Sequence, residues 1–190
     1  MKQKLIDTAC RLWREKSYNE VSVSQICKAC GVTKGSFYYY FDAKSDILTA
    51  CYRSLCDKYQ TDALKKCMLT DSCIEKIRIL LDIYNQAAME LGPELIRVII
   101  YNTRDAGDDT VAKGNPYVRP EVYDMLLAAC AHGQETGEIR GDESPEDLIE
   151  YLTAAATGMM LYWISLKKDF DINAFLKKTV ELLLSAPRPC

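Results

Sequence analysis

Cysteine is the residue type best placed to carry chemistry in this sequence. The chain of 190 residues holds nine cysteines but a single histidine, His132. Cys27 and Cys30 form one Cys-x-x-Cys pair, whereas a structural zinc site needs four ligands, and neither a second such pair nor a group of histidines accompanies it. The pair therefore has two interpretations: small buried residues of a helix, or thiols with redox or metal chemistry.

The sequence contains few of the motifs that mark known enzymes. A Gly-rich phosphate loop followed by Lys and Ser or Thr is missing, and only His132 could serve a catalytic triad. We therefore expect a protein that is not an enzyme and that uses no cofactor and no metal. A thiol-based redox sensor stays open as an alternative function, because several further cysteines are available for it. These are Cys51, Cys56, Cys67, Cys73 and Cys130.

The sequence shows neither an export signal nor a membrane span. Residues 1–16 are interrupted by charges every few positions, unlike a signal peptide. The longest apolar run, residues 152–166, is shorter than the roughly 18 residues that cross a bilayer. We expect a cytoplasmic protein with free thiols and no membrane contact.

Helical periodicity extends along nearly the whole chain. Apolar residues recur at spacings of three and four, and no segment alternates as a strand does, which predicts an all-α fold of about nine helices. Ser22 followed by Gln25 is a capping box, so a second helix should begin near Val23 and end at Gly31. Thr33 can cap a third, very short helix. A long helix should begin near Lys44.

The run Phe37-Tyr38-Tyr39-Tyr40-Phe41 belongs to that short helix. Successive side chains are about 100° apart around a helix, so five rings in a row cannot all face one core. Phe37 and Phe41 are four residues apart and can anchor the helix, which leaves Tyr38 and Tyr39 facing outward. The second and third helices with the turn between them then form a helix-turn-helix, whose second helix enters the major groove of DNA.

The charge distribution agrees with an anionic partner at the N-terminus. Residues 1–46 hold eight Lys or Arg against five Asp or Glu, a net charge of +3. Because the whole chain carries −3, the remaining residues carry −6. A basic end on an acidic body favours contact with a polyanion there.

The stretch TACRLWREKSYNEVSVSQICKACGVTKGSFYYYFDAKSDIL, residues 8–48, resembles the DNA-binding domain of the TetR family of bacterial regulators. The positions that match the family pattern in register are Val21 to Val23, Gly31 to Thr33, Gly35, Phe37, Tyr38, Tyr40, Phe41 and Lys44. The resemblance implies double-stranded operator DNA as a partner. The DNA-contacting residues that we predict from it are Thr33, Lys34, Gly35, Ser36, Tyr38, Tyr39 and Lys44.

The resemblance also implies two domains: residues 1–46, which bind DNA, and residues 47–190, which bind an effector and dimerise. The protein would be a ligand-released homodimeric repressor with an unknown small-molecule effector. Residues that could line an apolar effector cavity, unless they are ordinary core, are Tyr84, Tyr101, Tyr123, Met159, Tyr162 and Trp163.

The dimer interface is expected on the last two helices, Pro145–Lys167 and Asp171–Ser185. A small-residue face, Thr153 to Gly158, would allow a partner helix to approach closely. The apolar residues expected to surround it are Leu152, Met159, Leu176, Val180 and Leu183.

Overall fold

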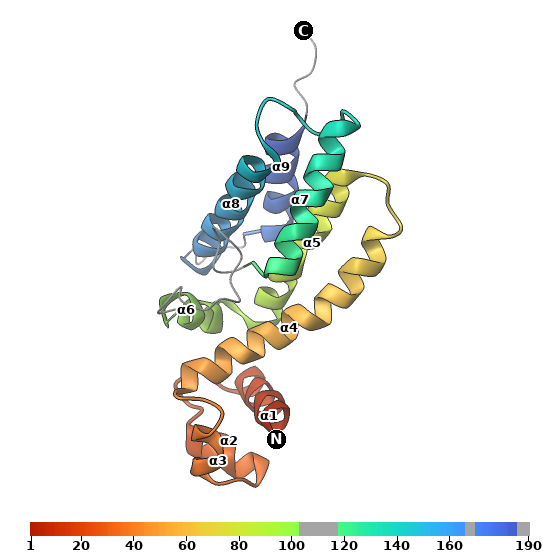
Figure 1. Cartoon of the computed structure of the whole chain (residues 1–190). Helices are drawn as coiled ribbons and strands as arrows, with labels where there is room; N and C mark the ends of the chain where they lie inside the picture. The colour runs from red at the N-terminus through yellow and green to blue at the C-terminus, as the bar shows by residue number, and fades with distance from the viewer. Residues whose placement is uncertain (103–117, 166–169, 186–190) are drawn as a thin grey trace. The chain divides into compact units, whose positions relative to one another are not determined.

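The structure is a computed structural model that describes residues 1–102, 118–165 and 170–185. These residues form nine α-helices and no strand beyond one isolated antiparallel bridge between Ile139 and Ser185 (Figure 1). The helices are α1 (Lys2–Glu15), α2 (Val23–Cys30), α3 (Lys34–Tyr38), α4 (Lys44–Cys67), α5 (Cys73–Leu91), α6 (Pro93–Asn102), α7 (Pro120–Glu135), α8 (Pro145–Ser165) and α9 (Ile172–Leu184). The all-α fold expected from the periodicity is confirmed. In the part of the chain that is described, no helix combines the length and apolar character needed to cross a membrane.

The described residues divide into two compact units. The N-terminal unit combines Met1–Lys58 with Ala87–Arg104, and the C-terminal unit combines Tyr59–Gln86 with Asp105–Cys190. Helices α4 and α5 therefore each contribute residues to both units. The division of labour between residues 1–46 and 47–190 concerns function and stays a prediction.

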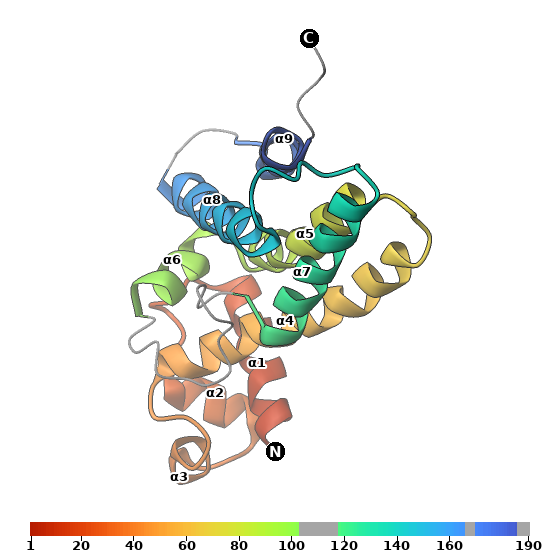
Figure 2. The ribbon, with the colours of Figure 1, turned by 45° about the horizontal axis from the view of Figure 1, so that its top comes forward.

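The core of the N-terminal unit is built from apolar side chains of its first four helices. Helix α1 packs against α2, and α2 packs against α3 (Figure 2). Each large side chain removed from water stabilises the unit by about 1.5–3 kcal/mol. The fully buried residues include Leu5, Ala9, Ile26, Phe37, Ile47 and Leu48.

In the C-terminal unit, α8 packs against both α7 and α9 (Figures 1 and 2). Gly133 on α7 permits a close approach of the following turn, because a Cβ there would lie only 2.5 Å from Ile139 Cδ1. Ile139 is buried, and its N–H donates to the Gly133 carbonyl at 2.9 Å. The contact fixes the turn between α7 and α8.

That turn supplies the cap of another helix. The Glu138 carboxylate accepts hydrogen bonds from the backbone N–H groups of Cys73 at 2.6 Å and Ile74 at 3.2 Å, and from the Ser72 hydroxyl. These N–H groups belong to the first turn of α5, where no carbonyl of the same helix can accept them. Burial alone would raise the pKa of the Glu138 carboxyl, but the hydrogen bonds outweigh it and hold the pKa below its ordinary value of 4.5.

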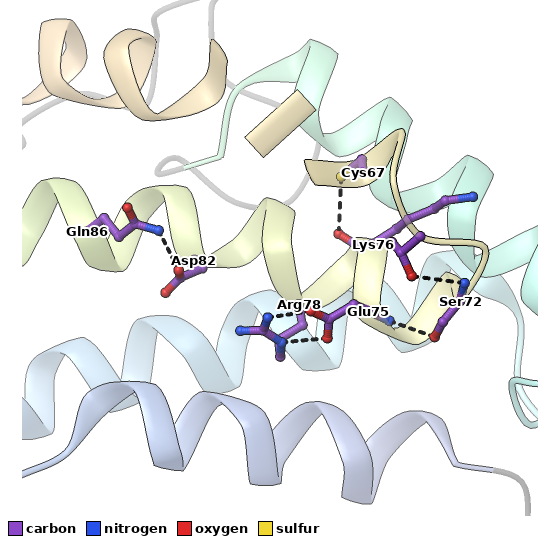
Figure 3. A network of polar contacts seen from close by, with 8 residues as sticks. Cys67, Ser72, Glu75, Lys76, Arg78, Asp82 and Gln86 are labelled. Atoms are coloured by element: carbon purple, nitrogen blue, oxygen red, sulfur yellow. Dashed lines mark hydrogen bonds and ion pairs between the residues drawn. The ribbon is translucent and has the colours of Figure 1, made fainter. Parts of the chain in front are cut away.

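Further polar contacts line α5 (Figure 3). The Ser72 hydroxyl accepts from the Glu75 N–H at 3.1 Å, and the Arg78 guanidinium donates twice to the Glu75 carboxylate, from Nε at 2.7 Å and from Nη2 at 2.5 Å. One turn further on, Gln86 donates to Asp82 at 2.5 Å. Side chains three and four residues apart thus pair along the helix surface.

Four of the residues expected to surround the dimer interface are buried within a single chain, contrary to the sequence analysis. Leu152, Met159, Leu176 and Val180 are at most 3% exposed within a single chain. They are part of the core of a single chain, so the prediction that they provide apolar area for a partner is wrong. When a helix is apolar on two sides, the residues of each side recur with the same helical spacing. The sequence therefore does not show which side packs within the chain and which side faces a partner.

Removing the charge of the α5 cap tests its contribution to stability. Glu138→Gln should lower the free energy of unfolding by about 1 kcal/mol at neutral pH, since the neutral amide cannot accept the same three bonds. The pKa of Glu138 is lowered on folding, so its stabilisation is present above the unfolded pKa and is lost as the pH falls through the folded one.

Urea unfolding at several pH values measures this difference. The gap between the wild type and Glu138→Gln should be largest above about pH 5 and should close as the solution becomes more acidic. Glu143→Gln, which changes an exposed carboxylate of the same region, is the matched control and should show little effect. A gap that does not depend on pH would contradict the role of the ionised cap.

Candidate nucleic-acid interface

Local capping interactions set the boundaries of α2. The Ser22 N–H donates to Gln25 Oε1 at 2.7 Å, and the Gln25 N–H donates to Ser22 Oγ at 3.3 Å, which completes the expected capping box. At the other end, Gly31 adopts a left-handed conformation with φ of 69°. A residue with a Cβ would be strained there, so glycine allows the sharp turn into α3.

The tip of α3 is exposed and held by its own side chains. Thr33 Oγ1 accepts from the Ser36 N–H at 3.2 Å and lies 3.1 Å from Ser36 Oγ. Lys34 and Gly35 follow in the first turn, and both are exposed. A Cβ at Gly35 would meet only Thr33 Oγ1, at 3.7 Å, so the outer surface of this turn is open.

The aromatic run divides as the helical geometry predicts. Phe37 is fully buried and Phe41 is 5% exposed, and their ring centroids are 5.6 Å apart. Tyr38 and Tyr39 are 53% and 80% exposed. The expectation that the phenylalanines anchor α3 while these two tyrosines face outward is confirmed.

Helix α1 is fastened to α2 by reciprocal hydrogen bonds. Lys4 Nζ donates to the Cys30 carbonyl at 2.9 Å, and Cys30 Sγ donates to the Lys4 carbonyl at 3.6 Å. Cys27 and Cys30 are buried and free, and burial together with the neighbouring Cys30 raises the pKa of the Cys27 thiol. The interpretation of this pair as small core residues fits these surroundings.

Lys44, the first residue of α4, is tied to the loop after α1. Its Nζ donates to the Tyr18 carbonyl at 2.8 Å and lies 3.8 Å from the centroid of the Tyr18 ring. Burial lowers the pKa of the Lys44 ammonium. The Tyr18 ring in turn stacks on Trp13 of α1, with the ring centroids 5.7 Å apart. The backbone N–H of Tyr18 donates to the Glu94 carboxylate at 3.0 Å.

The interactions of Tyr18 and Lys4 are features that sequence reasoning missed. In each case a lysine reaches a carbonyl 26 residues away. No periodic or capping signal in the sequence links such distant positions. The aromatic pair of Trp13 and Tyr18, spaced five residues apart, is the single local hint of this arrangement.

The structure distributes the predicted effector residues over both units. Tyr101 lies in the N-terminal unit and is 72% exposed, while the other five lie in the C-terminal unit. Met159 is buried, Tyr162 is 59% exposed, and the Tyr84 hydroxyl accepts from the Arg119 N–H at 3.1 Å. The remaining two, Tyr123 and Trp163, are half-buried.

A polar cavity of about 60 Å³ lies between α4 and α5 within the C-terminal unit. Its lining includes Asp62 and Lys66 of α4 and Arg78, Asp82 and Gln86 of α5, the last three of which appear in Figure 3. None of the predicted effector residues lines it. Their assignment to an effector site stays a prediction.

The N-terminal helices of this chain match a known family of regulators. The model of the bacterial regulatory proteins of the tetR family matches residues 5–51, which span most of α1, all of α2 and α3, and the start of α4. The HTH-type transcriptional regulator AcrR of Shigella flexneri is 22% identical over 187 residues, which cover 96% of this chain and 87% of that protein.

Two solved structures share the fold. Thermus thermophilus FadR, a TetR-family transcriptional repressor in complex with lauroyl-CoA, aligns with a TM-score of 0.71 at 19% identity and covers 96% of this chain and 93% of its own. Bacillus subtilis FadR in complex with stearoyl-CoA aligns with a TM-score of 0.62 at 19% identity and covers 97% and 98%. Residues 5–51 thus belong to the tetR family of bacterial regulatory proteins, and nearly the whole chain shares the helical fold of the two FadR structures.

Proposed function

We propose that the protein is a homodimeric repressor that binds operator DNA through α3 and releases it when a small-molecule effector binds. The observation that carries the proposal is the tip of α3, formed by the exposed Thr33, Lys34 and Gly35 and the half-buried Ser36, on a helix whose other side is anchored by Phe37. A recognition helix needs both properties, because it must reach base edges without losing its orientation. As a DNA-bound regulator it would act in the cytoplasm, and we propose no enzymatic activity.

The residues of the tip are suited to different parts of DNA. Lys34 can donate to a base edge or to a phosphate, and the absence of a side chain at Gly35 lets the backbone approach the groove. The hydroxyl groups of Thr33 and Ser36 already serve the cap, which holds the first turn in place. Tyr38 and Tyr39 offer phenol groups that can donate to phosphate oxygens beside the groove.

Lys44 is proposed as a phosphate contact with a second, structural role. An ammonium group has three donor hydrogens, and the Tyr18 carbonyl accepts one of them. Because the same side chain holds the loop after α1, its removal would weaken both the fold and DNA binding. Lys34 is therefore the cleaner probe of charge.

The dimer interface is proposed on an exposed apolar face of α8 and α9. Tyr151, Leu161 and Tyr162 on α8 and Phe175 and Leu182 on α9 are between 39% and 67% exposed. Exposed apolar residues grouped on two packed helices are typical of a protein–protein interface. A two-fold dimer would present two recognition helices to a near-palindromic operator.

The effector is proposed to be an apolar molecule bound among the aromatic residues of the C-terminal unit. Support comes from the half-buried rings of Tyr84, Tyr123 and Trp163 and from the buried Met159, all of which belong to this unit. The two FadR structures hold acyl-CoA molecules, so a long-chain acyl-CoA is the first compound to test. A ligand can release DNA only through its different affinities for the bound and released states.

DNA binding is tested at Lys34. Tight-binding duplexes are first selected from random-sequence DNA, and affinity is then measured by fluorescence anisotropy at several salt concentrations. Lys34→Ala should weaken binding and reduce the salt slope by about one unit, since one fewer counterion is released. Lys65→Ala removes the same charge from an exposed site in the C-terminal unit and should leave the slope unchanged. Equal slopes for wild type and Lys34→Ala would rule out the contact.

Effector binding is tested with lauroyl-CoA, and free coenzyme A serves as the control for the shared nucleotide part. The Trp13→Phe variant leaves Trp163 as the sole tryptophan. Lauroyl-CoA should change Trp163 emission and lower the affinity for the selected DNA at least about fivefold. Release without a change in emission would place the effector away from Trp163, and no release would eliminate this class of effector.

Dimerisation is tested by charge on the exposed face. Leu182→Arg would bury an unpaired charge in the interface, which costs several kcal/mol, so monomers are expected by light scattering. The unfolding transition should be retained, because Leu182 is 67% exposed in the single chain. Leu69→Arg is the matched control: it makes the same change at an 87% exposed leucine outside α8 and α9. A dimeric Leu182→Arg protein would refute the proposed face.

A further inference from the structure

A pair of thiols lies in the core of the N-terminal unit, away from the tip of α3. Cys10 of α1 is partly exposed, and Cys51 of α4 is fully buried. Both line a cavity of about 20 Å³ together with Trp13 and Leu55. That volume is enough for one water-sized molecule.

The two sulfur atoms are held beside the same turn of α1. Cys51 Sγ donates to the carbonyl of Ile6 at 3.4 Å, and Ile6 lies one helical turn before Cys10 in α1. The Cys10 and Cys51 side chains also lie close enough for each thiol to shift the pKa of the other. The Cys51 thiol has one proton for two acceptors, so it can turn from the Ile6 carbonyl to the Cys10 sulfur when Cys10 ionises.

Trp13, which lines the cavity, also has an unused hydrogen-bond donor. Trp13 Nε1 is buried and has no acceptor among the described residues. A buried N–H without a partner is costly, so a small polar molecule in the cavity would be stabilised by accepting from it. The neighbouring Arg14 also lines the cavity and is paired with Glu90.

The surroundings give the two thiols different reactivities. The pKa of the Cys10 thiol is lowered, mainly by hydrogen bonding from Cys51 and further by the positive charge of Arg14. Burial and the negative charge of Asp7 act in the opposite direction but are outweighed. The hydrogen bond with Cys10, burial, and the charges of Cys10 and Asp7 raise the pKa of Cys51. Since the thiolate is the nucleophile, Cys10 is the residue that attacks first.

We propose that Cys10 and Cys51 form a peroxide-reactive thiol pair that closes to a disulfide between α1 and α4. The Cys10 thiolate attacks one oxygen of hydrogen peroxide, the O–O bond breaks, and the leaving hydroxide takes a proton to form water. The resulting sulfenic acid is attacked by the Cys51 sulfur, which forms the S–S bond and releases a second water. Two thiols lose two hydrogens in total, and one peroxide is reduced to two waters.

This chemistry does not depend on DNA or on an effector. It also differs from a reaction of the Cys-x-x-Cys pair, since Cys27 and Cys30 are both buried and the pKa of the Cys27 thiol is raised. The test therefore uses the free, reduced, full-length protein and reads the chemistry directly.

Peptide mapping of the wild type identifies the disulfide that peroxide produces. The reduced protein is treated with hydrogen peroxide, its remaining thiols are alkylated, and it is digested without reduction for mass spectrometry. The expected product joins the peptides that contain Cys10 and Cys51. A disulfide between Cys27 and Cys30 as the first product, or no disulfide at Cys10, would overturn the proposal, and neither outcome requires a variant to fold.

Variants then assign the order of the steps. Cys51→Ser should stop the reaction at a Cys10 sulfenic acid, which dimedone traps, and Cys10→Ser should abolish both products. Cys27→Ser is the matched control and should still form the Cys10–Cys51 disulfide. Trapping of a sulfenic acid at Cys51 in the wild type would contradict the assignment of Cys10 as the nucleophile.

The rate of alkylation gives an independent check at neutral pH. Burial, with smaller contributions from Glu146 and Cys73, raises the pKa of Cys130 to about 11, so its thiolate is scarce. Cys10 should react with iodoacetamide at least about tenfold faster, because its larger thiolate fraction outweighs the lower intrinsic nucleophilicity of a weaker base. Equal rates for the two cysteines would refute the proposed activation of Cys10.

Discussion

The burial of Phe37 is the interaction on which the rest of the candidate interface depends. A helix of five residues is far too short to be stable by itself in water, so α3 exists because tertiary packing holds it. Phe37 and Phe41 provide that packing from one side of the helix. The same helical rotation that turns them inward turns Tyr38 and Tyr39 outward, so anchoring and exposure are two results of one geometry.

Contacts between distant residues then fix the surroundings of α3. Lys4 fastens α1 to the end of α2, and Lys44 fastens the start of α4 to the loop that carries Tyr18. In both cases a charged group donates to a backbone carbonyl, which makes a stronger bond than a neutral donor would. Two lysines thus fasten the helix-turn-helix to its surroundings, each through a hydrogen bond from its ammonium group to a carbonyl.

The sequence predicts best what depends on neighbouring residues. The capping box of Ser22 and Gln25, the left-handed Gly31 and the Thr33 cap all act within four residues, and the structure has each of them. The cap that Glu138 gives to α5 joins residues more than 60 positions apart and leaves no local pattern. The apolar surroundings of the dimer face were predicted wrongly at Val180 and Leu176, because α9 is apolar on its buried side as well as at exposed positions such as Phe175 and Leu182.

The participation of α5 in both units has a consequence for how the protein can be made and dissected. The N-terminal unit includes Ala87–Arg104, which the ribosome synthesises long after the helix-turn-helix itself. Glu90 and Glu94 from this segment bind Arg14 and the Tyr18 N–H, so a fragment that ends at Lys58 would lack these partners. The unit can be completed only after about half of the chain has left the ribosome, and a shortened gene for the first 58 residues would encode an incomplete domain.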